Sequence, residues 1–168
     1  MTQPVRFTST KWETRTVPLI AEPDFEDLSE ALTAEERAEE VRARDEAQET
    51  YERFRPITLE VKRVSRTTRQ KWDRTFARIL ADDEVSRHEA KGQSGALHVD
   101  TIEKLQAYNE DVVKTALVRV QGLIVGDVDI SEVSPSEALE ALSDCNLTGY
   151  ACKAIRKCQS PTVKQGEA

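Results

Sequence analysis

The chain has 168 residues, of which 38% are apolar and 33% are charged, and its formal net charge is −7. This length suits one domain with extensions or two small helical lobes, and an apolar content below the usual ~45–50% limits the core. The acidic balance argues against general nucleic-acid binding. The sequence has no run of ~20 apolar residues, so we expect no membrane span. It also shows no apolar core of a secretory signal, so we expect a cytoplasmic protein.

Residues 1–28 are predicted to form a flexible N-terminal arm. Three prolines interrupt the segment, and its apolar residues are scattered: Phe7, Trp12, Val17, Leu19, Ile20 and Phe25. Thr14 to Ile20 fits a short extended segment. Of two interpretations, a disordered leader and an arm that docks on a partner through its aromatic side chains, we favour the leader, because chain ends are ordered only when something ties them down.

A charged helix is predicted over residues 29–55. Thr33 and Glu36 form an S/T-x-x-E capping box at its start, and the body is rich in strong helix formers. Large apolar residues are few, so the helix has little surface to bury. We interpret it as a solvated spacer, with one strand of a helical assembly as the alternative.

The remainder of the first lobe, which spans 29–81 as a whole, is predicted to be a strand and a second helix. Apolar and polar residues alternate from Ile57 to Lys62, a pattern typical of a half-buried strand. Ser65 then caps a helix over about 66–81, in which Trp72, Phe76, Ile79 and Leu80 share one face. From Lys62 to Arg78 there are seven basic residues and one acidic residue, the only concentrated positive segment of the chain.

A glycine-containing linker over 82–99 separates this lobe from a helical lobe over 100–160, and 161–168 form a polar tail. Apolar residues between 102 and 120 follow a helical period, and the next loop carries enough apolar residues to enter the core. Ser134, Pro135 and Glu137 mark the start of a short helix, and a last helix follows Asn146. The predicted fold class is mainly α with a small β element and a helical C-terminal lobe.

No signature of catalysis is visible in the sequence. Phosphate-binding glycine motifs, a nucleophile elbow and zinc-protease motifs are absent. His88 and His98 fall in the linker, and Asp127 with Asp129 supplies fewer oxygens than a divalent cation needs. The three cysteines have no zinc spacing and suit helix faces as small apolar residues. We therefore expect no enzyme and no catalytic, cofactor or metal site.

The basic segment from Lys62 to Arg78 is the strongest candidate for binding. Its positive charges with Trp72 could grip phosphates, yet Trp72 lies on the apolar face and fits a core position better. Pairing with the acidic helix, in the same chain or another, uses the same charges, so we prefer protein over nucleic acid as the partner. The candidate partner-binding residues are Trp72, Phe76, Leu80, Arg69 and Arg74.

A strand-like ITLEVKRVSR leads into the helix TTRQKWDRTFARILADD; a long helix ending ALVRVQGLIVGDVDI, the short SPSEALEAL and the final LTGYACKAIRKCQSPT follow. Over about residues 57–163, this order of segments resembles the tail assembly chaperones of long-tailed bacteriophages. The resemblance rests on order and character, without a fixed motif, and the charged segment 26–55 departs from the compact members.

The resemblance implies a non-enzymatic role in the cytoplasm of a bacterial host. Such chaperones bind the tape measure protein, keep it soluble and help to recruit tail tube protein. A virion structural subunit and a nucleic-acid-associated accessory protein using 62–78 remain as alternatives, and homo-oligomerisation stays open.

Overall fold

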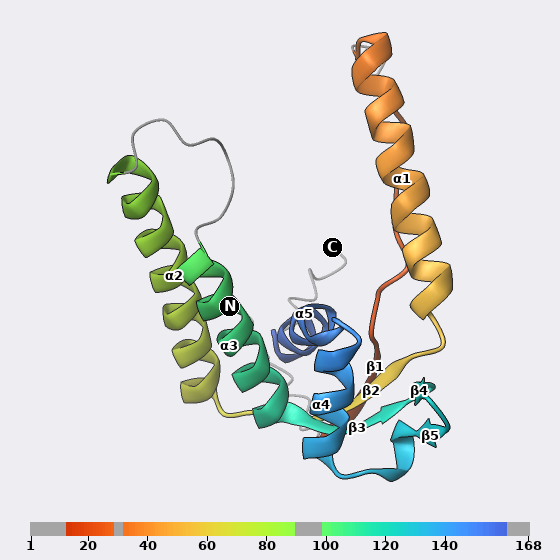
Figure 1. The fold of residues 1–168 in the computed structure, drawn as a ribbon, viewed down its shortest axis with the longest axis vertical. Coiled ribbons are helices and arrows are strands. Elements are labelled where there is room, and N and C mark those ends of the chain that lie inside the picture. Colours follow the sequence, from red (N-terminus) through yellow and green to blue (C-terminus); the bar gives the residue numbers. More distant parts are fainter. Residues whose placement is uncertain (1–12, 29–31, 90–98, 161–168) are drawn as a thin grey trace, which may run out of the picture.

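The protein is mainly α-helical with a small antiparallel sheet, as the sequence predicts (Figure 1). The structure, a computed structural model, describes residues 13–28, 32–89 and 99–160. In chain order the elements are β1 (Thr14–Pro18), α1 (Ala34–Phe54), β2 (Thr58–Lys62), α2 (Arg66–Glu89), α3 (Val99–Ala116), β3 (Leu117–Gln121), β4 (Ile124–Val125), β5 (Val128–Asp129), a 3-10 turn (Ile130–Glu132), α4 (Pro135–Asp144) and α5 (Thr148–Gln159). None of the described helices combines the length and apolar character that crossing a bilayer requires.

A three-stranded sheet joins regions that the sequence assigns to separate parts of the chain. The strand order is β1-β2-β3 with antiparallel neighbours, and β2 forms from the predicted alternating segment. Leu59 and Val61 of β2 are fully buried. The N-terminal arm supplies β1 through the predicted extended segment, and the first and second lobes supply β2 and β3. Residues 14–19 of the arm are thus tied to the sheet, and the two predicted lobes share one core.

Leu19 anchors the arm just after β1. Its side chain is 2% exposed, and its backbone N–H donates to the carbonyl oxygen of Ile57 at 3.0 Å. The prediction of a flexible arm over 1–28 therefore does not describe residues 14–19, because backbone pairing and burial of one leucine hold them in place. Residues 1–12 lie outside the described part of the chain.

The predicted helix to Val120 is wrong in its last turn. Helix α3 ends at Ala116, and Leu117–Gln121 form β3 against β2. Val118, Arg119, Val120 and Gln121 alternate as a strand does, and β-branched side chains favour the pleated sheet. Val120 is fully buried opposite Leu59, so pairing with β2 decides the conformation.

The core lies between the sheet and helices α3, α4 and α5. Val112 and Val113 of α3, Leu142 of α4 and Ile155 of α5 are all fully buried. Helix α4 begins as predicted, with Pro135 in the first turn and a reciprocal capping box between Ser134 and Glu137. The helical C-terminal region thus provides most of the enclosed apolar surface.

The loop predicted to enter the core does so only in part. Leu123 and Ile130 are buried, whereas Ile124 and Val128 are exposed on the β4–β5 hairpin. A two-strand turn alternates its side chains between two faces, so half of them point away from the core.

Helix α1 stands away from the body of the protein (Figure 1). It begins with the predicted capping box, in which Thr33 and Glu36 bond each other's backbone N–H, and none of its residues is buried. Hydrogen bonds from Thr33 lower the pKa of the Glu36 carboxyl group. At its base, the Phe54 ring lies 6.3 Å from the Tyr150 ring of α5. Along its length, Arg44 stacks over the ring of Phe25 at 5.2 Å.

Helices α2 and α3 form an antiparallel hairpin on the opposite side from α1 (Figure 1). Helix α2 continues to Glu89, so residues 82–89 of the predicted linker are helical. Packing against the start of α3 explains the extension, because tertiary contact stabilises helix beyond local sequence preference. The glycines Gly92 and Gly95 lie outside the described residues.

Candidate protein interface

Trp72 lies in the core and not on an outer face. Its side chain is 3% exposed and belongs to the apolar cluster beneath α2. This placement follows from the helical period, since Trp72 and Ile79 occupy the same stripe, and both are buried. Trp72, the first of the five candidate partner-binding residues, is therefore a core residue that packs beneath the surface of α2.

Phe76 lies one turn further along α2, half-buried between two helices. Its ring is 5.6 Å from the Tyr108 ring of α3, and the Arg156 guanidinium of α5 lies 5.0 Å from its centroid. Arg156 also donates from Nη2 to Oδ1 of Asp73 at 2.8 Å. The Arg156 guanidinium thus packs over both aromatic rings, Phe76 and Tyr108, at the base of the hairpin.

Tyr108 occupies the α3 side of this junction. It is 4% exposed, and among the described residues its hydroxyl has no hydrogen-bond partner. Burial raises the pKa of Tyr108 to about 12, and the nearby Arg156 charge partly opposes the shift. The phenol is neutral at physiological pH and serves as packing surface.

Leu80 is the apolar candidate residue that the structure leaves exposed to solvent. It is 44% exposed, and it lies beyond Arg156 toward the tip of the hairpin. Ile102 on α3 is 51% exposed, and Leu105, one turn nearer the base, is half-buried. Because Phe76 meets Tyr108, antiparallel packing places the next turns of both helices side by side. We call Phe76, Leu80, Ile102 and Leu105 the hairpin patch.

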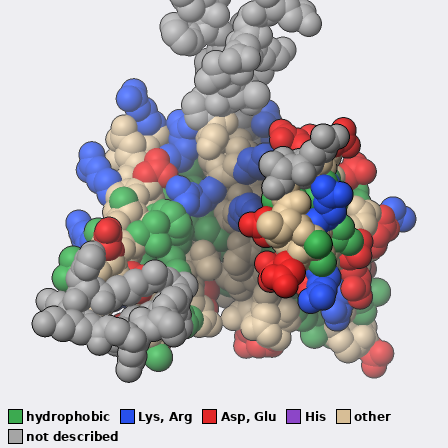
Figure 2. Space-filling view, turned by 90° about the horizontal axis from the view of Figure 1, so that it is seen from above, with side chains coloured by type: hydrophobic (Ala, Val, Ile, Leu, Met, Phe, Trp, Pro, Cys, Tyr) green, Lys and Arg blue, Asp and Glu red, His purple; other side chains and the backbone are tan. Residues whose placement is uncertain are grey.

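Figure 2 shows hydrophobic side chains gathered on the α2–α3 side of the molecule, with lysine and arginine side chains nearby. The α1 side carries a largely acidic surface in the same view. An apolar cluster bordered by charge is typical of a surface that meets another polypeptide.

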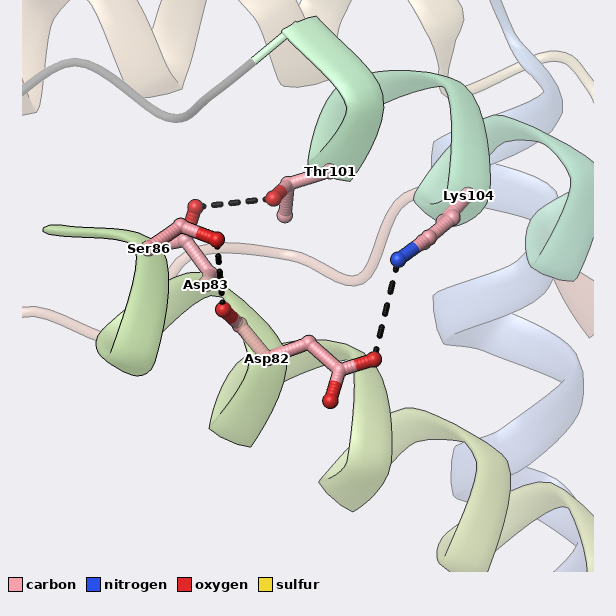
Figure 3. Close-up of polar contacts among 5 residues, drawn as sticks. All are labelled: Asp82, Asp83, Ser86, Thr101 and Lys104. Atoms are coloured by element: carbon pink, nitrogen blue, oxygen red, sulfur yellow. Dashed lines mark hydrogen bonds and ion pairs between the residues drawn. The ribbon is translucent and has the colours of Figure 1, made fainter. Parts of the chain in front are cut away.

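Polar contacts hold the outer half of the hairpin together (Figure 3). Thr101 Oγ1 donates to Oδ1 of Asp83 at 2.8 Å, and both side chains are buried. Lys104 Nζ lies 3.6 Å from Oδ2 of Asp82. Since a buried carboxylate needs partners to offset lost hydration, these contacts fix the register of α2 on α3. The linker predicted over 82–99 would not form these contacts, which depend on the helical ends of α2 and α3.

Arg69 joins two adjacent depressions at the base of α2. Its Nη1 donates to the carbonyl oxygen of Gln159 at 2.7 Å, while its Nε is buried and has no partner among the described residues. The first depression, of about 580 Å³, is lined by Glu13, Arg63, Val64, Ser65, Arg66 and Arg69. The second, of about 290 Å³, is lined by Arg69, Trp72, Asp73, Arg156, Lys157, Gln159 and Ser160.

We call the five basic residues around these hollows the basic depression: Arg63, Arg66, Arg69, Arg156 and Lys157. Sequence reasoning found its first half in the segment 62–78 but missed α5, which carries three basic residues and no acidic one. Arg74, the last candidate, lines neither hollow and is exposed.

Gln159 fixes α5 against the end of β2. Its amide nitrogen donates to the Lys62 carbonyl oxygen at 2.8 Å, and its amide oxygen accepts from the Val64 N–H at 3.1 Å. The side chain is 6% exposed. A buried amide that bonds two backbone groups positions α5 against the end of β2, and no local sequence pattern predicts this contact.

The described residues offer little for covalent or metal chemistry. Among them, no three His, Cys, Asp or Glu side chains gather closely enough to hold an ion. Burial raises the pKa of the Cys152 thiol to about 11. Asp129 caps the 3-10 turn by accepting from the Ser131 N–H at 2.9 Å, and this bond lowers its pKa. The side chain of His88 and all of His98 lie outside the described residues.

Comparison with known proteins yields no relative. No protein-family model, no curated protein and no solved structure matches this chain.

Proposed function

We propose that the protein is a non-enzymatic tail assembly chaperone that binds the tape measure protein, keeps it soluble and assists assembly of the tail tube. The observation that carries the proposal is the hairpin patch, where Leu80 and Ile102 remain about half exposed beside a packed aromatic base. An elongated helical client with apolar stripes would cover such a patch by laying one helix along it.

The charge of the chain supports the same role. A net charge of −7 keeps a complex with an aggregation-prone client dispersed in solution. The polar contacts of Asp83 and Lys104 join α2 to α3, so the patch is formed within the chain itself, which favours binding of a client.

Co-expression with the tape measure protein of the same virus tests this function. We expect the wild-type chain to raise the soluble fraction of the client and to co-purify with it. Replacing Leu80 and Ile102 by glutamate should weaken capture about tenfold or more, because the apolar area they bury on binding is lost.

Ile124 and Val128 provide the matched control, since they are 67% and 53% exposed on a different hairpin. Their replacement by glutamate should leave capture unchanged. Equal capture by the Leu80/Ile102 variant would refute the proposed surface. Finding the chain in purified virions by mass spectrometry would replace the chaperone function with that of a structural subunit.

A further inference from the structure

Helix α1 presents an acidic face that packs against no basic surface within the described part of the same chain. The helix carries eight acidic and four basic residues. Glu35, Glu39, Glu46 and Glu49 recur along one side of the helix, which Arg42 and Arg53 share, so four acidic and two basic residues lie there. This side lies opposite the one on which Arg44 stacks over Phe25. None of these four carboxylates makes a hydrogen bond or ion pair with another described residue. We call them the acidic stripe.

The basic depression carries the opposite sign at the other end of the sheet. Three of its arginines come from the end of β2 and the start of α2, and α5 adds Arg156 and Lys157. Glu13 and Asp73 also line it, so the positive charges are spaced and not continuous. Spaced cations can pair one by one with the spaced carboxylates of a helix.

The two surfaces do not meet within one chain. The C-terminal end of α1 leads to the start of β2, and the basic depression lies past the far end of that strand, about 17 Å on. From its base, α1 points away from the sheet (Figure 1), and its 21 residues span about 30 Å. It packs extensively against neither α2 nor α5.

From this charge complementarity we propose that the acidic stripe of one copy docks in the basic depression of a second copy of this chain. The contact is heterologous, so it can close into a small ring or continue as a filament. It is mainly electrostatic and therefore sensitive to salt. This inference uses neither the hairpin patch nor the client and does not depend on the proposed function.

Sedimentation velocity at about 50 mM and about 500 mM salt measures the association directly. We expect a mass of at least twice the 18.9 kDa of the chain at low salt and the single-chain mass at high salt. Two charge-reversed variants locate the contact. One carries Glu39→Lys, Glu46→Lys and Glu49→Lys, and the other carries Arg66→Glu and Lys157→Glu. Each alone should sediment as a single chain, and their mixture should associate again because both charges are exchanged.

Matched controls reverse the same charges elsewhere. Arg74→Glu with Arg78→Glu lies on α2 but lines neither hollow, and Glu132→Lys, Glu140→Lys and Asp144→Lys lie around α4. Both controls should associate like the wild type at low salt. Circular dichroism of each variant checks that it is folded.

The proposal is overturned if the wild type remains a single chain at low salt, if the controls lose association equally, or if the mixed variants fail to associate. A labelled single-stranded oligonucleotide is the competing probe. Salt-sensitive binding of this probe that Arg66→Glu with Lys157→Glu abolishes, in a protein that stays a single chain, would assign the depression to nucleic acid.

Discussion

Replacing Trp72 by alanine measures how much of the fold depends on the base of the hairpin. The indole is 3% exposed, and an aromatic side chain of this kind buries ~150–250 Å². At ~25 cal/mol per Å², losing most of that area and leaving a cavity should lower the free energy of unfolding by about 3–5 kcal/mol. For a chain of this length, the melting temperature should fall by about 6–20 °C.

Urea unfolding followed by far-ultraviolet circular dichroism checks the value. With a slope of about 2 kcal/mol per molar urea, the midpoint should fall by about 2 M while the slope is unchanged. Leu80→Ala is the control, because its side chain is 44% exposed and should lose about 1 kcal/mol or less. A loss below about 1 kcal/mol for Trp72→Ala would refute the core assignment of the indole.

Three further outcomes follow from single contacts. Gln159→Ala should lower the free energy of unfolding by about 1–3 kcal/mol in urea titrations, because two backbone groups lose their amide partner; an unchanged midpoint would contradict this. Gly122→Ala should lower the free energy of unfolding by about 2–4 kcal/mol, because φ is +77° and a Cβ would clash with the backbone carbonyl oxygen of Pro56. Gly126→Ala is the control, since at φ +61° its Cβ would meet open space, and it should cost only about 1 kcal/mol. Equal melting temperatures of the two variants would refute the clash at Gly122. Burial raises the pKa of the Cys152 thiol to about 11, so the stability that the protonated thiol contributes is complete below pH 9 and is lost as the pH rises toward 11. In mass spectrometry of the folded protein, iodoacetamide should therefore label the exposed Cys145 before the buried Cys152. Equal labelling rates would contradict the burial of Cys152.

Local signals predict the elements whose sequence and packing agree. Thr33 with Glu36 and Ser134 with Glu137 mark the starts of α1 and α4, where the cap is made within one turn. The alternating segment that forms β2 is also recognisable, because its two faces differ in polarity. In each case the residues that decide the conformation are neighbours in the sequence.

Elements whose conformation depends on residues far away in the sequence cannot be predicted from local signals. Residues 117–121 fit the helical period that precedes them, and only the pairing of Val120 with Leu59 makes them a strand. Strand β1 likewise depends on β2, since it is largely exposed and ordered by backbone pairing. The basic depression combines residues about 90 positions apart, as in the Arg69–Gln159 bond, so the sequence showed only its first half.

Polar contacts between α2 and α3 explain how a chain with limited apolar content can leave apolar side chains exposed to solvent. If Leu80 and Ile102 were needed to hold α2 on α3, they would turn inward and no patch would remain. The buried pair of Asp83 and Thr101 holds the outer turns instead, and Phe76 with Tyr108 holds the base. A client helix that covers the patch then adds apolar burial without competing for contacts that the hairpin itself requires.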